Sequence, residues 1–238
     1  MGTRFELVFP DGEPARAAGE TALEEIEACH ARFSRFDGAS LLNHILRIGA
    51  EEPVPLDADS YALFEDAVRV WRESEGAFDP TVPHRDMDAI ELDPRTCRIR
   101  LTRPVARLDL GAIAKGHALD LAARALRDHG ITSAFLHGGT SSAAGIGTPR
   151  GEPGWRVALT GGDEVLLRDQ ALSVSAVWEG NPHPTLDPRT GAPLPPSPRA
   201  AVIGPSARLA DAWSTAVLVL GGRTARMPAA YVVIAGQG

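Results

Sequence analysis

The stretch VARLDLGAIAKGHALDLAARALRDHG, residues 105–130, changes its hydrophobic period at Gly111. Up to that glycine the residues alternate as in a strand, and beyond it apolar side chains recur at the spacing of a helix. The helical positions are Leu119, Ala122, Ala123 and Leu126. Gly130 follows the last of them, where glycine commonly ends a helix. We therefore expect a strand, a loop and a helix in this order.

Further elements of both kinds flank this unit. Apolar residues at helical spacing predict helices near 22–33, 60–75 and 209–220. The expected strands are CRIRL at 97–101, ITSAFLHGG at 131–139, WRVALTG at 155–161, EVLLR at 164–168, ALSVSAV at 171–177, AAVIG at 200–204 and YVVIAG at 231–236. Because the two kinds alternate irregularly and several strands are joined by glycine-rich turns, we expect an α/β (α+β) fold with a mixed, largely antiparallel sheet and flanking helices.

The composition is that of a folded protein, since 44% of the 238 residues are hydrophobic and 23% are charged. No linker or repeat divides the chain, so we expect a single domain over residues 1–238, built as one compact unit or as two intimate lobes. The two cysteines, Cys29 and Cys97, lie far apart without paired spacing, which gives no support to a disulfide scaffold or a zinc site.

The charge distribution narrows the range of partners. The net charge is −7 and no long run of like charge occurs, which argues against nucleic acid or an anionic membrane surface. The apolar stretches are too short to span a membrane, and the start MGTRFELVF lacks a cationic, apolar leader. We expect no stable membrane insertion and a cytoplasmic location.

A single lysine, Lys115, stands among 24 basic residues. Because a compact ammonium differs from a planar guanidinium, its retention suggests a functional site, with chance drift as the alternative. Lys115 follows Asp109 in LDLGAIAKG, at the mouth of the expected helix. This loop suits a pyrophosphate, with an ordinary strand-to-helix turn as the alternative. A Walker loop is absent, and Pro149 interrupts the Rossmann-like GIGTPRG at 145–151.

Two oxygen-bearing side chains share one face of the last expected helix. Asp211 and Thr215 are four residues apart and roughly opposite Trp213, so the sequence predicts that they lie away from the apolar stripe. A carboxylate and a hydroxyl are ligands of the kind that Mg²⁺ takes. The alternative is a solvated acid beside a threonine that bonds back to the helix.

The histidines are candidate bases, with a structural role as the alternative for each. His137 lies in HGGTSS and His183 in NPHPTLDPRTG, and His44, His84 and His117 complete the set of candidates. Neither G-x-S-x-G nor H-E-x-x-H occurs, so a serine hydrolase and a zinc protease find no support.

Taken in order, the motifs MGT, GAFDPTV, LDLGAIAKG, DPRTG and DAWST resemble those of the ApbE family, the FAD:protein FMN transferases, along nearly the whole chain. The resemblance implies an ApbE-like, T-fold-like architecture that binds FAD as its substrate, with Mg²⁺ at the pyrophosphate. It implies transfer of FMN to a threonine hydroxyl of a client flavoprotein, with release of AMP. The alternatives are an FAD pyrophosphatase, which yields FMN and AMP, and a flavin-binding protein that has lost catalysis.

The resemblance also implies roles for individual residues. The metal ligands would be the backbone carbonyl of Ala112 and the side chains of Asp211 and Thr215. The FAD contacts would be Met1, Ala77, Phe78, Asp79, Asp109, Lys115 and Thr185. Pro184 stands where the family carries the histidine that assists the hydroxyl, so His183, one position earlier, is the candidate base. This departure, together with Thr140 and Ala176 at two other motif positions, motivates the non-catalytic alternative.

Overall fold

The computed structural model describes residues 3–10, 12–159, 162–177, 185–195, 199–222, 224 and 226–235. Its centre is a six-stranded sheet in which every neighbouring pair is antiparallel. In spatial order the strands are β1 (Phe5–Val8), β5 (Ala134–Gly138), β6 (Ser142–Ile146), β9 (Gln170–Ser175), β10 (Ala200–Gly204) and β11 (Val232–Ala235). The mixed α/β fold with a largely antiparallel sheet is therefore confirmed.

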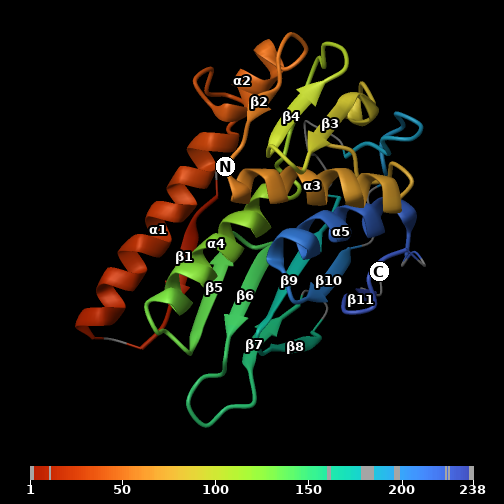
Figure 1. The fold of residues 1–238 in the computed structure, drawn as a ribbon. Coiled ribbons are helices and arrows are strands. Elements are labelled where there is room, and N and C mark those ends of the chain that lie inside the picture. Colours follow the sequence, from red (N-terminus) through yellow and green to blue (C-terminus); the bar gives the residue numbers. More distant parts are fainter. Residues whose placement is uncertain are drawn as a thin grey trace.

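Helices α4 and α5 cover one face of this sheet, and three further helices pack around them (Figure 1). The five α-helices of the described residues are α1 (Glu13–Phe33), α2 (Leu41–Ile48), α3 (Ala58–Glu73), α4 (Ala114–Asp128) and α5 (Ala207–Leu220). Helix α5 packs on β9 and β10, α4 packs beside α5, and α1 packs on α4. The core between these layers includes the fully buried side chains of Trp213, Phe64 and Leu119. The helices predicted near 22–33, 60–75 and 209–220 are present, the first as part of a longer helix.

Two smaller sheets complete the described structure. One has the order β2 (Val54–Pro55), β4 (Arg98–Leu101) and β3 (Ile90–Asp93), with the 3₁₀ helix η1 (Met87–Ala89) before β3. The other is the hairpin of β7 (Trp155–Ala158) and β8 (Glu164–Leu167). This hairpin packs against Leu172 and Ala201, which point away from the helices because successive strand residues face opposite sides of a sheet.

The strand expected at 105–111 does not form, so this prediction is wrong. Leu108 and Leu110 are buried as a strand pattern would require, but the backbone between them makes no ladder. The carboxylate of Asp109 instead accepts the backbone N–H of Gly111 at 3.0 Å. Such a local side-chain bond offers the backbone an alternative to a sheet, so the segment enters α4 as an irregular loop.

Cys29 is buried, Cys97 is half-buried, and both are free thiols. Within the part of the chain that the structure describes, no helix combines the length and the apolar character needed to cross a bilayer.

Candidate active site

A cleft of about 690 Å³ collects segments that lie far apart in the sequence. Its wall is formed by the loop after α3, the loop before α4, residues 185–188 and one side of α5. The lining residues that the sequence had singled out are Ala77, Phe78, Asp79, Asp109, Ala112, Thr185 and Thr215. The structure therefore brings seven predicted site residues together around one opening.

The first turn of α5 is fixed against α4. The carboxylate of Asp120, on α4, accepts the backbone N–H groups of Ala207 at 2.8 Å and Arg208 at 3.0 Å, together with the Ser206 hydroxyl at 2.7 Å. These N–H groups have no acceptor within their own helix, so Asp120 acts as a cap supplied by a neighbour. Burial raises the pKa of Asp120, and these hydrogen bonds oppose that rise.

Glycine at position 116 allows the two helices to approach. A Cβ atom at this position would lie 2.1 Å from the carbonyl oxygen of Ala207, which is a backbone contact that no side-chain rotation relieves. The close approach sets the next turn of α5, which carries Asp211, beside the first turn of α4, which carries Lys115.

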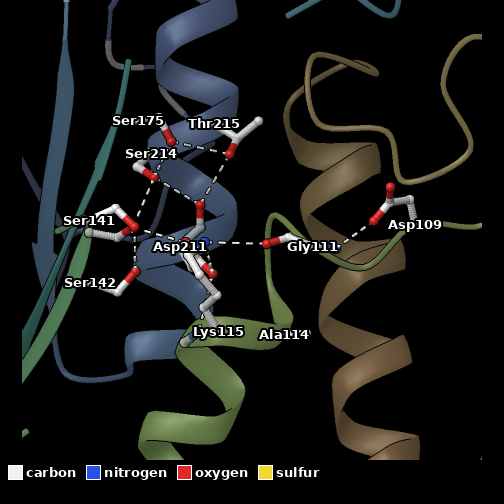
Figure 2. A network of polar contacts seen from close by, with 12 residues as sticks. Asp109, Gly111, Ala114, Lys115, Ser141, Ser142, Ser175, Asp211, Ser214 and Thr215 are labelled. Atoms are coloured by element: carbon white, nitrogen blue, oxygen red, sulfur yellow. Dashed lines mark hydrogen bonds and ion pairs between the residues drawn. The ribbon is translucent and has the colours of Figure 1, made fainter. Parts of the chain in front are cut away.

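The carboxylate of Asp211 is buried, and four hydrogen bonds surround it (Figure 2). Its Oδ1 accepts from Lys115 Nζ at 3.1 Å and from Ser173 Oγ at 3.0 Å. Its Oδ2 accepts from Lys115 Nζ at 3.3 Å and from the backbone N–H of Gly116 at 3.1 Å. The sequence placed this residue away from the apolar stripe of the helix, but it did not show that α4 and β9 cover this face of α5. The alternative of a solvated acid is therefore wrong.

Hydroxyl groups continue this network from Asp211 toward the cleft. Ser214 Oγ contacts Ser173 Oγ at 3.3 Å and Ser175 Oγ at 2.8 Å, and Ser175 Oγ contacts the Thr215 hydroxyl at 3.3 Å (Figure 2). These serines were not predicted from the sequence. A usable signal was their spacing, because Ser173 and Ser175 alternate along β9 and therefore share its helix-facing side.

The loop before α4 is held on both sides of Gly111. The Oδ1 atom of Asp109 accepts the N–H of Gly111 at 3.0 Å, and Lys115 Nζ donates to the carbonyl oxygen of Gly111 at 3.3 Å. The Oδ2 atom of Asp109 pairs with Arg35 at 3.0 Å and with Arg107 at 3.2 Å. Both arginines line the cleft, and neither was singled out as a site residue from the sequence. Two guanidinium groups on one carboxylate leave this edge of the cleft positively charged.

The adjoining part of the wall is shaped by Asp79, since the next residue, Pro80, accepts the backbone N–H of Asp109 at 2.8 Å. The Oδ1 atom of Asp79 accepts the backbone N–H of Thr81 at 2.7 Å and the hydroxyl of the same residue at 2.6 Å. Burial raises the pKa of Asp79, and these two hydrogen bonds oppose the rise. Phe78 and Ala77 are almost fully buried beside it. The GAFDPTV motif thus forms a tight, internally bonded wall of the cleft.

The oxygen donors near Asp211 fit a hard cation. Among the described residues, no group of three or more histidine, cysteine, aspartate or glutamate side chains is arranged to hold a metal. The fold does place together the Asp211 carboxylate, which already pairs with the Lys115 ammonium, the Thr215 hydroxyl on the next turn of α5, and the loop that contains Ala112. Oxygen donors of this kind suit Mg²⁺, which keeps several water molecules and needs few protein ligands.

Two predicted site residues, Met1 and His183, lie outside the described residues, so their roles stay predictions. Of the other candidate bases, His137 contacts the carboxylate of Glu6 at 2.9 Å and the carbonyl oxygen of Gly139 at 3.1 Å. It belongs to strand β5 and is not part of the lining of the cleft.

His117 is buried in a structural position. Burial, followed by the positive charge of Arg208, lowers the pKa of His117 to about 3, so the imidazole is neutral. Its Nδ1 atom lies 3.3 Å from a guanidinium nitrogen of Arg208, and its ring meets that of Phe33 edge to face. This histidine therefore fastens α4 to α5 and α1.

We expect His117 to make the protein acid-sensitive. The unfolded state takes up a proton near the usual pKa of about 6.5 while the folded state does not, so the stability contribution of neutral His117 is complete above that pH. It is lost on acidification between pH 6.5 and about 3, by up to about 1.4 kcal/mol per pH unit. Urea unfolding at several pH values should show a flatter acid limb for His117→Gln, and parallel curves would contradict this assignment.

The architecture matches solved structures over almost the whole chain. The flavin transferase ApbE from Vibrio cholerae, as its H257G mutant, superposes with a TM-score of 0.81 at 18% identity, covering 98% of this chain and 94% of that one. The ApbE protein from Thermotoga maritima superposes with a TM-score of 0.78 at 26% identity, covering 93% and 84%. The fold is thus that of the ApbE proteins.

The sequence agrees with this comparison. The sequence model of the ApbE family matches residues 1–85 and 82–231. The FAD:protein FMN transferase of Rhodobacter capsulatus is 31% identical over 249 residues, covering 93% of this chain and 46% of that protein. The protein of the same name from Haemophilus influenzae is 25% identical, with coverages of 93% and 79%. The chain spans about half the length of the Rhodobacter relative. On the strength of the family match, this chain belongs to the ApbE family.

Proposed function

We propose that this protein is a Mg²⁺-dependent FAD:protein FMN transferase that moves FMN from FAD to a threonine hydroxyl of a client flavoprotein. The observation that carries the proposal is the cleft whose wall joins the GAFDPTV, LDLGAIAKG and DAWST motifs in one place. The names of the relatives support the same activity. In this reaction the phosphorus of FMN exchanges its bond to the bridging oxygen of FAD for a bond to the threonine oxygen. AMP leaves with the bridging oxygen, and the hydroxyl proton passes to solvent.

In the proposed reaction, different residues of the chain would bind the cation, attract the diphosphate and exclude water. Asp211, Thr215 and the carbonyl group of Ala112 would hold the cation. When bound, Mg²⁺ supplies a positive charge that offsets the charge growing on the diphosphate as AMP leaves. Lys115 and the positively charged edge at Arg35 and Arg107 attract the diphosphate. The buried GAFDPTV wall keeps water from one side of it.

The proposal is tested by incubating the protein with FAD, Mg²⁺ and a peptide that contains one threonine. We expect a peptide whose mass has increased by that of an FMN group, together with an equal amount of AMP, and neither product with a threonine-to-valine peptide or after addition of EDTA. Free FMN and AMP without labelled peptide would instead identify an FAD pyrophosphatase. Tight FAD binding with no product would identify a non-catalytic flavin-binding protein.

A further inference from the structure

We propose that Lys115 is a resident counter-ion of the Asp211 carboxylate, which must leave that carboxylate before a divalent cation binds it, so that metal and FAD bind cooperatively. The inference rests on the proposed function, because the diphosphate of FAD is the new partner that the ammonium requires. It concerns the order and coupling of binding, which the proposed activity by itself does not define.

The Asp211 carboxylate is saturated with hydrogen bonds. A carboxylate has about four positions at which it can accept them. Lys115 occupies one on each oxygen, at 3.1 Å and 3.3 Å, and Ser173 and the N–H of Gly116 occupy the other two. An incoming cation therefore has to replace one of these donors.

Lys115 is the donor that can leave. The N–H of Gly116 belongs to the first turn of α4 and has no acceptor inside that helix, so its bond to Asp211 is fixed by the backbone. Ser173 lies in the interior of the sheet on β9 and is almost fully buried. The Lys115 side chain, in contrast, is 19% exposed while that of Asp211 is 3% exposed, and it has a flexible stem.

A second cation at this carboxylate would also be repelled by the ammonium. The carboxylate is buried, so the repulsion between two cations bound to it is screened less than it would be in water. A metal ion and the Lys115 ammonium therefore compete for the Asp211 carboxylate. In the protein without nucleotide, the displaced ammonium would retain only the carbonyl oxygen of Gly111, 3.3 Å away, as its remaining described acceptor.

A diphosphate in the cleft would compensate the displaced Lys115 ammonium for the acceptors that it loses at Asp211. Gly111 lines the cleft, so the ammonium that contacts its carbonyl group lies at the border of the space where the diphosphate would bind. Phosphate oxygens there offer Lys115 new acceptors as the cation takes over the carboxylate. Each ligand then strengthens binding of the other by the same factor, because coupling between two binding sites is reciprocal.

The first test measures metal binding without catalysis. Mn²⁺ binding to the nucleotide-free protein is followed by the loss of the free-ion signal in electron paramagnetic resonance at pH 8, with Mg²⁺ as competitor. We expect Lys115→Met to bind Mn²⁺ about tenfold more tightly than the wild type. FAD should tighten Mn²⁺ binding in the wild type and much less in the variant. A folded Lys115→Met protein with unchanged or weaker Mn²⁺ affinity would overturn the proposal.

The matched control is Arg124→Met. It also removes one positive charge from α4, but Arg124 pairs with Asp59 on α3 through two bonds of 2.7 Å and 2.6 Å. Its Mn²⁺ affinity should equal that of the wild type. A tenfold gain in this control as well would attribute the effect to net charge and would overturn the specific role of Lys115.

A second measurement uses the unmodified protein and does not depend on a variant that folds. Because Lys115 is the only lysine of the chain, labelling with ¹³C,¹⁵N-lysine gives one set of side-chain signals. The Cε and Nζ signals should shift when FAD and Mg²⁺ are both saturating. Signals that stay unchanged at saturation would overturn the proposal. A wild type that shows the shift and the coupling but forms no labelled peptide leaves the counter-ion role standing and removes the proposed transfer.

Discussion

Asp211→Asn is expected to lower the rate of FMN transfer by about a thousandfold, the effect of removing a main electrostatic group from an active site. The amide has nearly the shape of the carboxylate but lacks the charge that holds Lys115 now and the cation in the proposed function. Its NH₂ group would also face either the N–H of Gly116 or the Lys115 ammonium, both of which are donors. The rate is measured as labelled peptide formed at saturating FAD and Mg²⁺.

The same substitution should destabilise the fold, because it leaves buried donors without an acceptor. We expect the free energy of unfolding to fall by about 1–3 kcal/mol in urea titrations. Asp59→Asn is the matched control, since it breaks an exposed pair with Arg124 at 2.6 Å. Exposed pairs contribute about 0–1 kcal/mol, so this control should keep both activity and stability nearly intact. An Asp211→Asn protein that transfers FMN at the wild-type rate would remove Asp211 from the proposed site.

Gly116→Ala is expected to destabilise the protein by forcing α4 and α5 apart. The new Cβ would meet the backbone of α5 at 2.1 Å from the Ala207 oxygen and 2.7 Å from the Arg208 nitrogen, so the two helices must separate. We expect a loss of about 2–3 kcal/mol in the free energy of unfolding. Transfer activity should fall as well, because Asp211 would be withdrawn from the N–H of Gly116.

Gly38→Ala is the control for this prediction. A Cβ atom at that position would have no heavy atom of the described residues within 4 Å, and the change should leave the free energy of unfolding within about 0.5 kcal/mol of the wild type. If Gly116→Ala unfolds at the same urea concentration as this control, the close contact between α4 and α5 does not limit the packing of the two helices.

The sequence predicted correctly those features that depend on residues close to one another along the chain. The period of 3.6 residues placed Asp211 and Thr215 on one face of a helix, and the structure places both on α5, with Thr215 at the cleft. The change of period at Gly111 predicted α4. The short helix α2 was missed, although Ser40 was a usable start signal, since its hydroxyl accepts the N–H of Asn43 at 3.1 Å.

The sequence was uninformative where the contact is distant. Lys115 and Asp211 are separated by 96 positions, and no local pattern shows that α4 covers the polar face of α5. For this reason the sequence placed Asp211 away from the apolar stripe but did not show that its carboxylate is buried. Arg35 was missed for the same reason, because its partner Asp109 is distant in the sequence. Arg107 lies two residues before Asp109, so its pairing was a local signal that was not used.

The dispersed origin of the cleft has a consequence for biosynthesis. Its wall needs residues 77–79, 109–112 and 185–188 and also α5, which begins only at Ala207. A growing polypeptide that has left the ribosome only as far as β10 contains Lys115 but not its carboxylate partner. Such a chain cannot yet assemble the complete wall, so under the proposed function the capture of FAD is postponed until translation has passed α5.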